Sequence, residues 1–208
     1  MFNIKYKGNF VSDDQLIKGK SIPENAKEFG IISDLTKELG RGFIMSLPIF
    51  IIMVIMTYLK VKNINFHLKM NLDTIISFLI IIISVHILTI VHEIIHALFY
   101  PFKYEKEIWI SKEKGVRFVY CGEIISRTRY IVMALAPMFI LGIIPFTIWF
   151  ISPNIIPMPY NIAVAVIFWL MTIVAMGDIA NIYYVIKEVP KKAKVFNYGL
   201  LRSFYIEK

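Results

Sequence analysis

The feature that most constrains this chain is a long stretch without charge: no Asp, Glu, Lys or Arg occurs between Arg129 and Asp178. The chain is 57% hydrophobic and only 18% charged, whereas an average soluble domain is about 45–50% apolar and about 25% charged. A soluble fold of this size cannot hide so much uncharged surface, so a soluble globular enzyme is largely excluded. The dominance of Ile, Leu, Val and Phe excludes disorder, and the lone Cys121 excludes a disulfide scaffold. The composition indicates an integral membrane protein.

Four segments are apolar enough to span a bilayer, which takes about 20 residues of helix. They are Gly42–Leu59, Thr74–Phe102, Ile131–Ser152 and Ile162–Ile186. The last two are separated by the stretch 152–161, whose three prolines argue against one continuous helix. We therefore expect an all-α membrane protein in which residues 42–208 form a transmembrane domain of about four helices, arranged as two hairpins.

The positions of the basic residues predict the topology. Seven Lys and Arg lie in residues 1–41, seven in 103–129 and six after Ile186, but none lies between the third and fourth spans. The positive-inside rule then places both termini and the loop 103–129 in the cytoplasm of a bacterial cell, although three lysines between the first two spans conflict with it. Because the basic residues flank spans and no nucleic-acid-binding motif is present, the net charge of +8 indicates the lipid bilayer as a partner and not nucleic acid.

Two smaller elements are expected on the cytoplasmic side. Residues 1–41 form an amphipathic N-terminal segment, in which apolar residues at spacings of three and four predict a short surface helix over Pro23–Leu39. Alternating residues on both sides of Lys112-Glu113-Lys114-Gly115 predict a β-hairpin over Glu107–Tyr120, between the second and third spans.

The second span ends in His92-Glu93-Ile94-Ile95-His96, whose side chains are suited to metal binding and proton transfer. Residues four apart share one face of a helix, so both imidazoles can bind one Zn²⁺. Glu93 then lies where it can accept a proton from a water whose pKa the metal lowers toward about 7. Ionisable residues within a span are costly and indicate a functional site; the alternative is a set of polar residues that neighbouring helices satisfy.

A catalytic zinc commonly has three protein ligands and one open position. Asp178 is the acidic residue of the fourth span, and it lies at about the same depth as His92 and His96 if both spans run in the same direction. We therefore expect Asp178 as the third ligand. Asn181, one turn further on the same face, is expected either to orient Asp178 or to bond substrate backbone, or else to be an ordinary interhelical amide.

The remaining polar candidates are weaker. Glu123 either supports the metal site and its substrate or contacts lipid headgroups. His86 precedes His92 by six residues, which points it away from the zinc face. His67 is expected in solvated loop, and Cys121 is expected to be an inert thiol.

The chain resembles the three-helix core of the site-2 protease family of intramembrane zinc metalloproteases, and more closely the zincin peptidase family of bacterial membrane proteins. The matching pieces, within about residues 74–200, are His92 to His96, Gly122-Glu123-Ile124-Ile125-Ser126, Ala136-Pro137, Gly177-Asp178-Ile179-Ala180-Asn181 and the basic stretch 189–195. The first span lies outside this core. The resemblance implies His92, His96 and Asp178 as ligands of one zinc ion and Glu93 as catalytic base. One departure is that Ala175-Met176-Gly177 and Ile179 surround Asp178 where site-2 proteases carry an Asn-Pro-Asp-Gly or Leu-Asp-Gly type of motif.

Together these observations predict a membrane-embedded zinc metalloprotease that hydrolyses a peptide bond of a membrane protein or peptide near the cytoplasmic face. The edge of the predicted hairpin either binds an unwound substrate by β-addition or lies on the headgroups as a structural element. The alternative function is a non-catalytic membrane adaptor or regulator that retains a structural metal. A transporter is disfavoured, because the polar residues cluster near one end of the spans.

Overall fold

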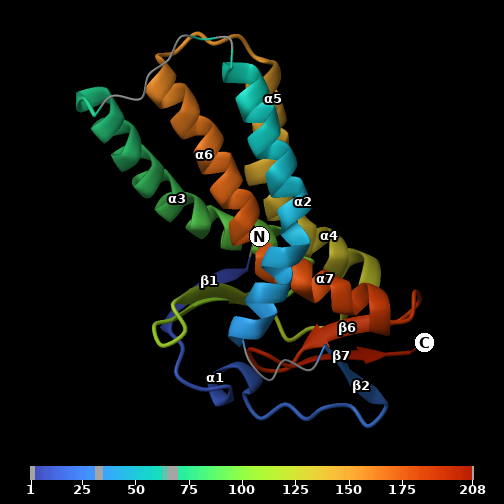
Figure 1. Cartoon of the computed structure of the whole chain (residues 1–208). Coiled ribbons are helices and arrows are strands. Elements are labelled where there is room, and N and C mark those ends of the chain that lie inside the picture. The colour runs from blue at the N-terminus through green and yellow to red at the C-terminus, as the bar shows by residue number, and fades with distance from the viewer. Residues whose placement is uncertain (1–2, 31–34, 63, 65–69, 208) are drawn as a thin grey trace.

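A computed structural model of the chain describes residues 3–30, 35–62, 64 and 70–207, so that His67 lies outside the described residues. A shaft of long helices rises from one end of the molecule, and small β-sheets gather at that same end (Figure 1). Both described ends of the chain, β1 and β7, belong to the sheet end.

The helices follow the predicted spans closely, with one difference. In chain order they are α1 (Asp14–Ile17), α2 (Leu35–Val61), α3 (Leu72–Phe99), α4 (Arg127–Pro137), the π-helix η1 (Met138–Ile143), α5 (Ile144–Ile151), α6 (Met158–Val174) and α7 (Met176–Glu188). Three helical stretches within the described residues are long and apolar enough to cross a membrane, namely 36–61, 72–99 and 127–151. The predicted fourth span is a bent pair, because α6 and α7 meet at a break with a bend of 40°.

Small residues allow the helices to approach closely. A Cβ atom added to Gly42 of α2 would lie 1.8 Å from the carbonyl oxygen of Met176 in α7, and one added to Gly142 of η1 would lie 2.4 Å from Oγ1 of Thr172 in α6. Close backbone approach at glycine is a common way for helices to pack in a bilayer. These contacts hold α2 against the bend and the third span against α6.

The structure contains more β-structure than the all-α expectation. The predicted hairpin is present as β3 (Lys106–Ser111) and β4 (Val116–Tyr120), and β1 (Ile4–Asn9) pairs with β3 in parallel to give the order β1-β3-β4. A second sheet has the order β2-β7-β6-β5, made of β2 (Ala26–Phe29), β5 (Ile125–Ser126), β6 (Lys194–Asn197) and β7 (Ser203–Ile206).

The helix predicted over Pro23–Leu39 is wrong for its first half. Residues 26–29 form β2, which pairs antiparallel with β7 at the other end of the chain, and Leu35–Leu39 instead begin α2. Gly30 follows β2 with a φ of +56°, a left-handed conformation that stops a regular element. Apolar residues at 29, 32, 35 and 39 suit a helix locally, but the pairing partner lies far away in the sequence and overrides that preference.

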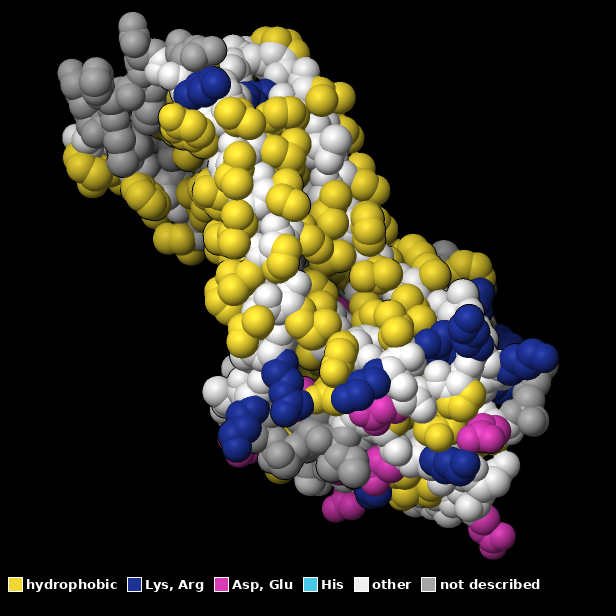
Figure 2. Space-filling view, turned by 45° about the vertical axis from the view of Figure 1, so that its right-hand side comes forward, with side chains coloured by type: hydrophobic (Ala, Val, Ile, Leu, Met, Phe, Trp, Pro, Cys, Tyr) yellow, Lys and Arg dark blue, Asp and Glu magenta, His cyan; other side chains and the backbone are white. Residues whose placement is uncertain are grey.

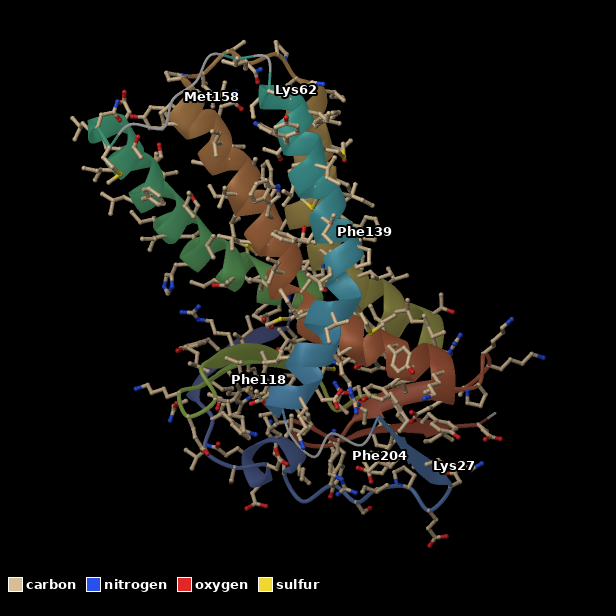
Figure 3. All side chains as sticks on the ribbon, viewed as in Figure 1. Lys27, Lys62, Phe118, Phe139, Met158 and Phe204 are labelled. Atoms are coloured by element: carbon tan, nitrogen blue, oxygen red, sulfur yellow. The ribbon has the colours of Figure 1, made fainter. Side chains whose placement is uncertain are left out.

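The side chains divide the molecule into an apolar shaft and a polar end. Hydrophobic side chains cover the visible face of the helical shaft, whereas Lys, Arg, Asp and Glu gather at the sheet end (Figure 2). Phe118, Phe204 and Lys27 mark the sheet end, Phe139 lies midway along the shaft, and Lys62 and Met158 mark its far end (Figure 3). This distribution is that of a protein whose helices cross a membrane and whose sheets lie at one of its surfaces.

Candidate metal centre and its cavity

The two histidines of the motif lie at the sheet end of α3, one helical turn apart on a buried face. The exposed fraction is 4% for His92 and 8% for His96, and their Nε2 atoms lie 3.0 Å apart. His96 Nδ1 lies 3.0 Å from the carbonyl oxygen of Met133 in α4. Because a carbonyl can only accept, His96 Nδ1 donates, and in the neutral ring Nε2 keeps its lone pair free.

Asp178 reaches this pair from the first turn of α7, directly after the bend. Its Oδ2 lies 3.2 Å from His92 Nε2, and its Oδ1 lies 3.2 Å from His96 Nε2. The bend at Ala175 matters, because it redirects the chain between α6, which packs along α3, and the turn that carries Asp178. The structure therefore brings together three side chains that the sequence predicted to meet; their role as metal ligands stays a prediction.

The geometry of these three side chains fits a metal ion such as zinc. Their ligand atoms all lie within 4.8 Å of one another, and the closest pairs are 3.0–3.2 Å apart. In a tetrahedral site with zinc–ligand distances of about 2.0–2.1 Å, ligand atoms are about 3.3–3.4 Å apart. Two imidazole nitrogens and a carboxylate that converge in a buried place are also the donors that zinc prefers, and the His96–Met133 contact is the usual support of a histidine ligand.

Glu93 faces the same cavity as the three convergent side chains. The cavity has a volume of about 270 Å³, and Glu93 is half-buried in its wall beside His92. Val119 in β4 lines the cavity together with Glu93. A carboxylate in the cavity wall next to the candidate ligands is placed to exchange a proton with a group in the cavity.

Strand β4 forms one wall of the cavity and is an edge strand of its sheet. It pairs with β3 on one side, and no other described strand pairs with it on the other side. The cavity is lined by β4 from Val116 to Tyr120. The predicted hairpin thus presents a free strand edge to the cavity.

The other sequence candidates lie in different surroundings. Asn181 lines the cavity, one turn beyond Asp178. Glu123 does not line it and pairs instead with Lys20 at 3.0 Å. His86 is exposed on α3. Cys121 is 2% exposed, and its burial raises the pKa of the thiol to about 11, which keeps it protonated and a poor ligand at neutral pH.

Three parts of the cavity were missed by sequence reasoning. Glu38 and Leu39 come from α2, which the family resemblance left outside the core. Tyr130, 5% exposed, comes from α4, and residues 197–203 come from the C-terminal sheet. The sequence did contain a signal for Glu38. This residue lies four positions before the predicted start of the first span, so one additional helical turn would include it in the same helix. Residues 197–203 carried none, since nothing local ties them to α3.

Glu38 is held in place by two neighbours. Its Oε1 accepts from Arg41 at 3.0 Å and its Oε2 accepts from the Tyr184 hydroxyl at 2.9 Å. Glu38 is 7% exposed, so this network satisfies a carboxylate that would otherwise be costly to bury. The first span is thereby tied to α7 and forms part of the cavity wall.

A helical shaft apolar enough for a bilayer, with an H-E-x-x-H helix that meets an aspartate at its polar end, is the arrangement expected of a membrane protein with a zincin-type metal site. Residues 85–194 match the model of a family described as "Putative zincin peptidase". The match covers more than half of the chain, and the chain belongs to this family. No curated protein and no solved structure matches it.

Proposed function

We propose that the protein is a membrane-embedded zinc metalloprotease that hydrolyses a peptide bond at the polar, cytoplasmic end of its helices. The observation that carries the proposal is the convergence of His92, His96 and Asp178 beside Glu93, in a cavity at the boundary between the apolar shaft and the sheets. Membership of the zincin peptidase family supports the same chemistry.

The residues around the cavity have different roles in the proposed reaction. His92, His96 and Asp178 would hold one zinc ion, which supplies a Lewis acid that polarises the scissile carbonyl and lowers the pKa of a water. Glu93 takes the proton of the attacking water and passes it to the leaving amine, so that the amine departs uncharged. Met133, through its carbonyl, fixes the ring of His96, and Asn181 is placed to bond substrate backbone on the α7 side of the cavity.

The substrate is held as an extended segment on the free edge of β4. An intact helix satisfies and shields its own carbonyls, so a membrane-spanning substrate must unwind before attack. The β4 edge offers main-chain groups to the unwound segment in place of its lost helical bonds. In a series of peptides N-methylated at one position each, loss of cleavage should alternate with a period of two residues near the scissile bond. Equal effects at successive positions would contradict this binding mode.

The function is tested by replacing Glu93 with glutamine in the purified protein. Glu93→Gln keeps the size and the hydrogen-bonding ability of the side chain but cannot accept the proton, so the cleavage rate should fall by roughly 10²–10⁴-fold. Glu123→Gln is the matched control, because Glu123 is paired with Lys20 outside the cavity, and its rate should stay within about twofold of wild type.

Candidate substrates come from quantitative proteomics of membranes that contain either the wild-type or the Glu93→Gln protein. A true substrate accumulates with Glu93→Gln and is cleaved when purified wild-type protein is added. A wild-type protein that holds zinc, and whose Glu93→Gln variant cleaves that substrate at an equal rate, would overturn the proposed mechanism.

A further inference from the structure

The turn between β6 and β7 lines the cavity of the candidate metal centre from the sheet end. Residues Asn197, Gly199, Leu200, Leu201 and Ser203 all line the cavity together with His92, His96 and Asp178. The turn closes on itself through a hydrogen bond from the Tyr198 amide to the Arg202 carbonyl, 2.9 Å long. Figure 1 shows β6 and β7 at the sheet end of the molecule, so this turn, together with β4, lines the cavity from the sheet end.

Asp13, far away in the sequence, holds the centre of this turn. The Leu200 amide donates to Asp13 Oδ1 at 2.8 Å. Gly199 has a φ of +83°, and a Cβ atom added there would lie 2.6 Å from Asp13 Oδ2. The contact is therefore close enough that Gly199 is required both by its backbone conformation and by the carboxylate beside it.

Neighbouring contacts fix the same turn to the N-terminal segment and to the β1-β3-β4 sheet. The Tyr198 hydroxyl donates to the Lys20 carbonyl at 2.9 Å, and the Tyr120 hydroxyl donates to the Asn197 carbonyl at 3.2 Å. Leu200 packs against a buried cluster, which consists of Phe10, Leu16, Trp109 and Tyr120. The turn is thus anchored at its middle by Asp13 and at its flanks by tyrosine hydroxyls.

We infer that Asp13 is a positioning residue that holds the β6–β7 turn as a cover on the aqueous side of the metal centre, so that a polypeptide in the bilayer reaches the centre more readily than a soluble polypeptide. The inference rests on the proposed function for its substrate preference, but not for the cover itself. Asp13 lies outside the segment that matches the family, 85–194. Local elements of this kind open with a free energy below that of global unfolding, so loss of one anchor increases access.

The cover is tested by thiol labelling, which needs no catalysis. Val174→Cys places a thiol in the cavity wall, in a Cys121→Ser background that also carries Glu93→Gln. The protein in lipid vesicles is treated with N-ethylmaleimide or with a polyethylene-glycol maleimide too large to pass the cover. Asp13→Ala should raise the labelling rate of the large reagent roughly tenfold, because the turn opens more readily when its hydrogen bond to a charged group is lost. The labelling rate of N-ethylmaleimide should stay within about twofold.

Two further variants separate the contact from general damage. Asp13→Asn keeps an acceptor for the Leu200 amide and should restore slow labelling by the large reagent. Gly199→Ala should behave like Asp13→Ala, whereas Gly8→Ala should behave like wild type, because Gly8 has a matching φ of +84° but nothing within 4 Å of an added Cβ atom. The cover is refuted if Asp13→Ala leaves the large-reagent rate unchanged or speeds both reagents equally, or if Gly8→Ala matches Gly199→Ala.

The substrate preference is measured separately with the catalytically intact protein. The ratio of cleavage rates for an unfolded soluble peptide and for the same sequence attached to a membrane anchor should rise roughly tenfold in Asp13→Ala. An unchanged ratio with increased large-reagent labelling would overturn the substrate preference but keep the cover. An absence of all cleavage by wild-type protein would count against the proposed function, while the labelling result still decides the cover.

Discussion

At the residue scale, the site depends on which nitrogen of each histidine faces the cavity. The Met133 carbonyl fixes His96 so that its Nε2 points at His92 and at Asp178, and the three groups meet 3.0–3.2 Å apart. Without a cation between them, two imidazole lone pairs and a carboxylate would face one another in a buried place, which is costly. A positive ion at the centre would remove this cost.

The convergence of three candidate ligands predicts the metal content of variants. Purified wild-type protein should hold about one zinc per chain, and His92→Ala or Asp178→Ala should reduce this to roughly a tenth or less, because each removes one of three ligands. Glu93→Gln should keep its zinc, since Glu93 is not one of the convergent ligands. Elemental analysis of protein purified without added metal gives the answer. Wild-type protein free of zinc would favour the non-catalytic adaptor.

At the scale of elements, the first span is part of the site and not an accessory anchor. It packs against α7 where Gly42 meets Met176, it contributes Glu38 and Leu39 to the cavity, and Glu38 is bonded to Tyr184. A displacement of α2 therefore moves the turn that carries Asp178. The sequence left this span outside the metalloprotease core because its relation to α7 is a tertiary contact.

Gly42→Ala tests this coupling. The added Cβ atom would overlap the Met176 carbonyl, so α2 must move off α7, at a cost of about 1–3 kcal/mol. Gly40→Ala is the control on the same helix, because nothing lies within 4 Å of its added Cβ atom, and it should be neutral or stabilising by about 0.5–1 kcal/mol. Thermal unfolding in detergent measures both variants. Equal stability of the two would show that the contact between α2 and α7 does not support the fold.

At the scale of the whole molecule, charge and strand pairing both distinguish the sheet end from the shaft. Lys and Arg side chains gather at the sheet end on the visible face (Figure 2). The two ends of the chain are also joined there, since β2 pairs with β7 and Arg202 bonds to Glu28 through two nitrogens at 2.8 and 3.0 Å. If the shaft crosses a membrane, both sheets and the strands nearest the two chain ends lie on one side of it.

The positive-inside rule predicts that this side is the cytoplasm. A reporter that is active only in the cytoplasm should be active when fused after Lys208 and inactive when inserted after Ile155, an exposed residue between α5 and α6. A reporter that is active only outside should show the opposite pattern. Activity of the cytoplasmic reporter at both positions would contradict a transmembrane path between them.

The sequence by itself determined that the chain has helices apolar enough to cross a membrane, where along the chain these helices lie, and that α3 carries two histidines and a glutamate within about one turn. These properties are local, because hydrophobicity over about 20 residues and a spacing of four along a helix need no distant partner. The β3–β4 hairpin is local in the same way, and it too was predicted.

Only the tertiary structure decided what surrounds the motif. The bend at Ala175 brings Asp178 to the histidines, and β2 becomes a strand because β7 lies beside it. The β6–β7 turn and Glu38 both line the cavity, although each lies more than fifty residues from His92 along the chain. Such pairings depend on packing and strand partners far away in the sequence, which no local pattern contains.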